Sequence, residues 1–123
     1  MTGSSSKLKS AIQVELRAAR AAEDLGELAR AWRLLERAHV LSQALAWPHI
    51  RVHLAMLVYA WRRRDRREVV GQVLRVLVAG PGSMLGRAPY GNTGGANVGI
   101  FAPMPIPEDL RAQLASLTAD EGP

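Results

Sequence analysis

Apolar residues recur every three or four positions along most of the chain up to Ala79, and this spacing predicts an all-α fold. The first expected helix covers about 10–24 and ends near Gly26, because glycine accepts the left-handed conformation that closes many helices. The second covers about 27–46 and ends at Trp47-Pro48. Its apolar stripe consists of Leu28, Ala31, Leu34, Leu35, Ala38, Leu41 and Leu45.

Two further helices are expected before the composition changes. Residues 49–61 are apolar nearly all round, which predicts a third helix that is the most buried element of the domain. An arginine cluster ends this helix, and a fourth helix follows over about 66–79. Its apolar side chains are Val69, Val70, Val73, Leu74, Leu77 and Val78. Gly80-Pro81-Gly82 is expected to end it.

Residues 80–107 hold most of the glycines and prolines of the chain, so this stretch predicts a long loop without a regular helix or a central strand. We expect the apolar side chains of Ile100, Phe101, Met104 and Ile106 to dock the loop on the helical bundle. A short C-terminal helix is predicted from Pro107 to about Leu117. Residues 1–123 thus form one helical domain, with a flexible N-terminus at 1–6 and a flexible tail at 118–123.

Consecutive helices of this length, joined by short turns, predict antiparallel helical hairpins. Leu25-Gly26 followed by Ala31, Leu35 and Ala38 resembles the small-residue spacing of tetratricopeptide repeats. The second hairpin follows that pattern less well, because its comparable positions, Tyr59, Asp65 and Gly71, come about forty residues later rather than the usual 34 or so. A tetratricopeptide-like fold and an ordinary antiparallel bundle both remain open.

The composition excludes several classes of protein. The chain of 123 residues has no cysteine, so disulfide frameworks, thiolate zinc fingers and cysteine nucleophiles are ruled out. There is no run of about 18 apolar residues and no signal peptide, so no membrane association is expected and the predicted location is cytoplasmic. The net charge of +5 invites a nucleic-acid hypothesis. That hypothesis is not favoured, because no aromatic residues interleave with the arginine cluster at 62–67.

All three histidines fall between His39 and His53, which makes this region a candidate metal site. If the turn between the second and third helices is centred near Ala46, His39 lies beside His53. We predict His39, His53 and Glu36 as ligands, with His49 or Gln43 as an outer ligand. Imidazole and carboxylate groups suit zinc, copper, nickel or iron, and helical bundles build such sites from inward-facing side chains.

A structural role for the same residues is the alternative hypothesis. His39 and His53 then form hydrogen bonds in the interior, while Glu36 pairs with a neighbouring arginine. A ferritin-like di-iron site is not favoured, because it requires the Glu-x-x-His step twice and the chain has it once. If the site does bind metal, affinity should fall below about pH 6.5, the ordinary pKa of histidine.

The glycine-rich segment YGNTGGANVG at 90–99 has three interpretations. Its glycines can supply positive φ angles while asparagine side chains bond to the backbone and fix the shape of the loop. It can instead contribute to a ligand pocket, or its backbone can cradle an anion. The residues concerned are Asn92, Thr93, Gly94, Gly95 and Asn97. Neither a P-loop nor a dinucleotide fingerprint is present, so no organic cofactor is predicted.

The strings AWRLLERAHVLSQ, HIRVHLAML, RAPYGNTGGANVG and PMPIPEDL resemble a family of small bacterial proteins described only as a domain of unknown function. The resemblance extends from Ala31 to Leu110 and implies a free-standing bacterial protein, with no activity to carry over. Three function hypotheses follow: a metal-binding protein for trafficking or sensing, a helical module that binds a protein partner, and a metal-dependent enzyme with the GNTGG loop over its site. No nucleophile elbow or pair of catalytic carboxylates favours the last.

Overall fold

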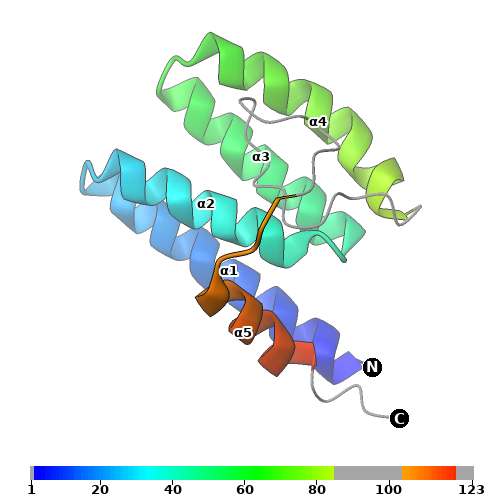
Figure 1. The fold of residues 1–123 in the computed structure, drawn as a ribbon. Helices are drawn as coiled ribbons and strands as arrows, with labels where there is room; N and C mark the ends of the chain where they lie inside the picture. The colour runs from blue at the N-terminus through cyan, green and yellow to red at the C-terminus, as the bar shows by residue number, and fades with distance from the viewer. Residues whose placement is uncertain (1, 85–103, 119–123) are drawn as a thin grey trace.

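The computed structural model describes residues 2–84 and 104–118, which form five helices joined by short turns and one longer connection (Figure 1). They are α1 (Thr2–Asp24), α2 (Leu28–Ser42), α3 (Ala46–Arg62), α4 (Arg66–Met84) and α5 (Glu108–Thr118). The described residues contain no β-strand. The all-α prediction is therefore confirmed.

The helices are arranged as two antiparallel hairpins. α1 packs against α2, α3 packs against α4, and the two hairpins meet where α2 lies on α3 (Figure 1). The short α5 lies against α1 and α2. The prediction of antiparallel helical hairpins is confirmed, and α2 lies between α1 and α3 and also contacts α5.

The apolar core is shared among α1, α2, α3 and the C-terminal segment. Its buried members are Leu8, Ile12, Ala19, Leu35, Ala38, Val40, Leu41, Val52, Met56, Ile106 and Leu110. The prediction that the third helix is the most buried element is wrong, since α3 leaves Leu54, Val58 and Trp61 exposed. α2 is more deeply enclosed, because other helices cover it on several sides.

Both hairpins close through the same type of turn. At the end of α1, Gly26 adopts φ 78° and its N–H donates to the carbonyl of Glu23, while the N–H of Glu27 reaches back to Ala22. These are the two hydrogen bonds of a Schellman motif. The end of α3 repeats the motif with Arg64 in the left-handed position, at φ 57°.

The C-terminal segment is fixed by burial and by an ion pair. Ile106 and Leu110 join the core, so the described end of the long connection is docked on the bundle as expected. The guanidinium of Arg37 on α2 donates to a carboxylate oxygen of Asp109 at 2.6 Å and to one of Glu15 at 3.4 Å. Arg37 thereby ties α5 and α1 to the central helix.

Several predicted boundaries are wrong, including the end of the second helix, which lies at Ser42 rather than near Ala46. The expected flexible N-terminus at 1–6 is helical from Thr2, because no proline interrupts this stretch and Leu8 and Ile12 anchor the helix in the core. α4 also continues through Gly80-Pro81-Gly82 to Met84. Glycine and proline cost a helix roughly 1 and 3 kcal/mol, so they weaken its last turns without forbidding them. The loop residues 85–103 and the tail 119–123 lie outside the described residues.

Candidate metal centre

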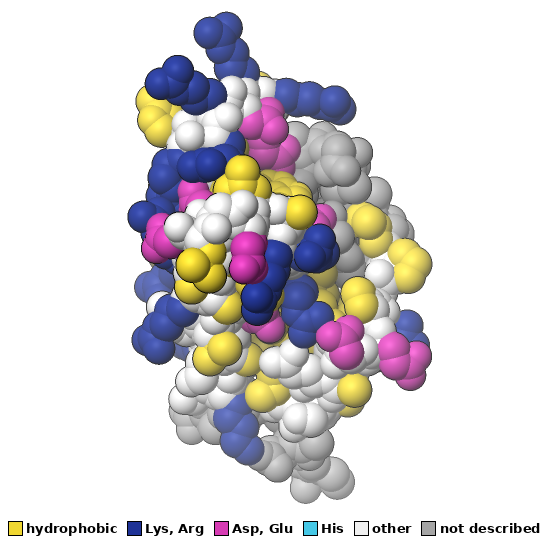
Figure 2. All heavy atoms as spheres, turned by 90° about the vertical axis from the view of Figure 1, so that its left-hand side faces the viewer, with side chains coloured by type: hydrophobic (Ala, Val, Ile, Leu, Met, Phe, Trp, Pro, Cys, Tyr) yellow, Lys and Arg dark blue, Asp and Glu magenta, His cyan; other side chains and the backbone are white. Residues whose placement is uncertain are grey.

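The three histidines meet in the interior, where α2 lies on α3. The Nε2 atom of His39 is 2.9 Å from that of His49 and 3.0 Å from that of His53, and the third side of this triangle measures 3.2 Å. Each side chain is buried, with at most 5% of its surface exposed. No histidine is seen on the face shown in Figure 2, where lysine and arginine side chains crowd the upper part. The three side chains lie close enough together to hold one metal ion.

Helix geometry places each ring. His49 and His53 are four residues apart on α3, so they project from the same face one turn apart. His39 faces them from the last turns of α2, where the Ser42 hydroxyl donates to the His39 carbonyl at 2.8 Å. The turn between the helices occupies 43–45. Because this turn is centred on Ala44 rather than near Ala46, His39 lies opposite the midpoint between His49 and His53 rather than beside His53 alone.

Hydrogen bonding alone cannot satisfy this triangle. The Nε2 atom of a neutral imidazole carries either one proton or one lone pair, so it cannot donate and accept at once. Three mutual contacts of about 3 Å therefore leave at least one pair of like groups facing each other, either two lone pairs or two N–H groups. A cation bound by all three lone pairs removes that repulsion. Ligand nitrogens about 2.0–2.1 Å from one ion are themselves about 2.9–3.4 Å apart, which matches the observed triangle.

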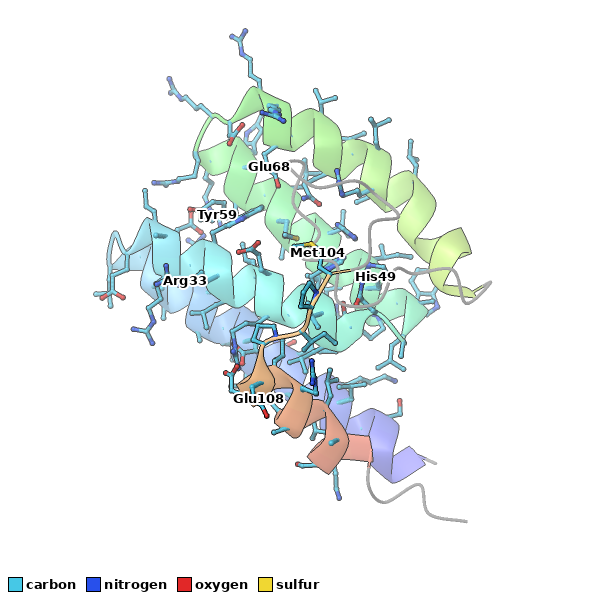
Figure 3. All side chains as sticks on the ribbon, in the orientation of Figure 1. Arg33, His49, Tyr59, Glu68, Met104 and Glu108 are labelled. Carbon is cyan, nitrogen blue, oxygen red and sulfur yellow. The ribbon has the colours of Figure 1, made fainter. Side chains whose placement is uncertain are left out.

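Two polar side chains of α4, Gln72 and Glu68, form a chain of hydrogen bonds that ends at His53. The Nδ1 atom of His53 is 2.7 Å from the side-chain oxygen of Gln72, and the amide nitrogen of Gln72 donates to the carboxylate of Glu68 at 3.1 Å. Gln72 is completely buried. Figure 3 labels the two ends of this network, His49 near the start of α3 and Glu68 near the start of α4. These hydrogen bonds connect the three histidine rings to α4.

Burial keeps the histidines in the form that binds metal. Removal from water lowers the pKa of His49 to about 4, and the positive charge of a protonated His53 contributes in the same direction. The pKa of His53 is also lowered to about 4, mainly by burial and further by the charge of Arg75, although the Gln72 hydrogen bond opposes the shift. Both rings are therefore neutral at pH 7, which is the state that coordinates metal ions.

The structure brings together only some of the residues predicted as ligands. His39 and His53 are neighbours as expected, and His49, predicted as an outer ligand, is an equal member of the triangle. Glu36 is half-buried on α2 and is not part of the cluster. The loop residues predicted to contact a ligand lie outside the described residues; they are Asn92, Thr93, Gly94, Gly95 and Asn97.

Sequence reasoning missed Gln72 and Glu68. They stand four residues apart on a helix whose other side chains are largely apolar, a spacing that puts them on one face. Such a pair is ordinarily read as part of a solvated surface. The only signal for an inward orientation was the presence of an uncharged amide one turn after an acid, on the helix expected to pack beside the histidines.

Comparison with known proteins identifies the family. Residues 6–114 match the family model described as protein of unknown function (DUF3703). The chain belongs to this family. No curated protein and no solved structure matches it. In the part of the chain that the structure describes, no helix is long and apolar enough to cross a membrane.

Proposed function

We propose that this member of the DUF3703 family is a metal-binding protein that holds one divalent transition-metal ion between α2 and α3. The Nε2 atoms of His39, His49 and His53 are the ligands. The observation that carries the proposal is the convergence of three buried nitrogens at 2.9–3.2 Å, a spacing that suits one ion and that hydrogen bonds cannot fully satisfy.

The donor set favours a borderline ion. Imidazole nitrogens bind zinc, copper, nickel and iron well, whereas magnesium and calcium prefer oxygen. Three neutral imidazoles leave the full charge of the ion uncompensated by its ligands, and this favours completion of the coordination shell by water or a small anion. Among the candidate ions, zinc is the first to test, because it accepts three protein ligands and one exchangeable ligand without a redox change.

The test is calorimetric titration of chelator-treated protein with zinc, cobalt, nickel and copper at pH 7. We expect a stoichiometry of one ion per chain for the wild type. His39→Ala and His53→Ala should each weaken binding at least about 100-fold, since even indirect supports of metal ligands are worth 10–100-fold. Glu36→Ala is the matched control on the same helix as His39, and it should change affinity by no more than a few-fold. Equal binding by all variants would overturn the proposal and favour the protein-interaction module.

A metal-dependent enzyme is the second candidate function. Structural zinc sites usually have four protein ligands, whereas catalytic sites have three and keep one position open. The cluster among the described residues has three. Turnover of a hydrolysable ester or phosphoester by zinc-loaded protein, lost in His53→Ala, would favour this candidate over a role in metal trafficking or sensing.

A further inference from the structure

We propose that Gln72 is a positioning residue that selects the tautomer of His53. Gln72, oriented by Glu68, keeps the proton of His53 on Nδ1, so that the Nε2 lone pair points toward the ion. This inference rests on the proposed metal-binding function. It adds two residues of α4 to a site that otherwise consists of side chains from α2 and α3.

The direction of each hydrogen bond follows from chemistry. An ionised carboxylate can only accept, so the Gln72 group that contacts Glu68 at 3.1 Å is the amide N–H₂. The amide oxygen of Gln72 must then face His53, and it too can only accept. His53 therefore donates from Nδ1, and in the neutral ring this leaves a lone pair on Nε2. One acidic residue thus fixes the tautomer of a histidine with which it has no direct hydrogen bond.

The start of α4 holds the acidic end of this chain in place. The N–H of Glu68 donates to the side-chain oxygen of Asp65 at 3.0 Å, which caps the helix immediately after the α3–α4 turn. Glu68 lies one helical turn before Gln72, so the two side chains stack on the face that looks toward α3. The polar row from Asp65 to His53 is therefore built on the backbone of a capped helix rather than on a loop.

Packing alone does not explain a fully buried glutamine at this position. An apolar side chain of similar volume would fill the same space without the cost of burying an amide. α4 has such side chains, Val70, Val73, Leu74 and Leu77, and all four are exposed. Val69 and Val76 are half-buried, but the two buried side chains that the structure describes on α4, Gln72 and Arg75, are both polar, so its inner face has a polar requirement. Orientation of a metal-ligating imidazole meets that requirement, because ligating histidines commonly donate their second nitrogen to an acceptor.

The tautomer itself is the most specific readout. Long-range ¹H–¹⁵N spectra of metal-free protein distinguish histidines protonated at Nδ1 from those protonated at Nε2. For His53 we expect the Nδ1–H form in the wild type and in Gln72→Glu, which keeps an acceptor oxygen. Gln72→Leu should shift His53 toward the Nε2–H form. Gln113→Leu on α5, which packs against α1 and α2, is the matched control and should leave the spectrum unchanged.

Zinc titrations of the same variants test the consequence. Gln72→Leu should weaken binding about 10–100-fold and Gln72→Glu should restore it to within a few-fold of the wild type. Glu68→Gln should lie between them, since a second amide no longer dictates which way Gln72 turns. An unchanged tautomer and unchanged affinity in Gln72→Leu would overturn the inference. If the wild type binds no zinc, the proposed function fails, while the tautomer spectra still decide the role of Gln72.

Discussion

The two hairpins of this protein share a turn geometry and differ in what they bury. Between α1 and α2 the buried side chains are mainly apolar, such as Ile12, Ala19 and Leu35. Between α3 and α4 they include His53, Gln72 and Arg75. The first hairpin follows the usual rule that a helix turns its apolar stripe inward. The second departs from this rule on α4, where Gln72 and Arg75 are buried while apolar side chains such as Leu74 and Leu77 are exposed.

This difference in burial predicts that truncating a leucine on α2 and truncating one on α4 will change the free energy of unfolding by very different amounts. Leu41→Ala on α2 removes a side chain that is 1% exposed, and it should lower the free energy of unfolding by about 2–5 kcal/mol. Leu74→Ala on α4 removes one that is 52% exposed, and it should change that free energy by no more than about 0.5 kcal/mol.

Urea denaturation followed by circular dichroism measures both changes. Comparable losses for the two variants would mean that the outer face of α4 is covered in solution. The apolar side chains on the outer face of α4 would then stabilise the protein through that contact, and the two hairpins would not differ as described.

The buried histidines of the α3–α4 hairpin should also make the stability of the metal-free protein depend on pH. The pKa values of His49 and His53 are lowered to about 4. Between pH 6.5 and 4, these histidines are therefore protonated in the unfolded chain but remain neutral in the folded state. Stability is therefore complete above pH 6.5 and falls as the pH drops toward 4. At about 1.4 kcal/mol per unit of pKa shift, one such histidine costs roughly 3 kcal/mol over this range.

Denaturation of metal-free protein at intervals between pH 7 and 4.5 checks this expectation. His53→Gln should have a shallower slope than the wild type over that interval. Carboxylates contribute below it, because Arg62 lowers the pKa of Glu23 from its ordinary value of 4.5. With these pKa values, proton competition with the metal at His49 and His53 should begin nearer pH 4 than the ordinary histidine pKa of about 6.5. A slope that persists unchanged in His53→Gln would assign the effect to other groups.

The smallest expected effects concern the two turns. Gly26→Ala places a side chain on a left-handed residue and should cost about 1 kcal/mol, although no heavy atom lies within 4 Å of the added Cβ. Arg64→Gly relieves the corresponding strain in the second hairpin, at φ 57°, and should stabilise by up to about 1 kcal/mol. Thermal unfolding of both variants measures the difference. A lower melting temperature for Arg64→Gly would show that the arginine side chain contributes more than its backbone conformation costs.

The sequence predicted the first hairpin better than the second. The stripe that includes Leu35, Ala38 and Leu41 placed α2 correctly, because burial there follows helical periodicity. The apolar side chains of α4 form an equally regular stripe, yet Val70, Val73, Leu74 and Leu77 are exposed. Periodicity reports which residues share a face and does not say which way that face points. Only the packing of α4 on α3 decides that Gln72 lies inside.

The candidate site, like the fold, was only partly predictable from the sequence. The concentration of histidines on both sides of the turn between the second and third helices predicted that His39 and His53 would meet. The equal position of His49 depended on a turn at 43–45 that sequence could not locate to within one residue. A shift of that size rotates a helix face by about 100°, which is enough to exchange an inner ligand for an outer one. Glu36 was predicted because it precedes His39 by three residues on the same face of the helix, yet the half-buried Glu36 lies outside the cluster.

X-ray absorption spectroscopy of the zinc-loaded protein tests the central claim most directly. Three imidazole nitrogens on one ion should give a first shell of nitrogen and oxygen at about 2.0–2.1 Å, with the outer-shell scattering of three histidine rings. The wild type should show three rings, and His39→Ala, if it retains any ion, should show two. A shell made only of oxygen, or a ring count that is the same in both proteins, would contradict a metal centre built from His39, His49 and His53.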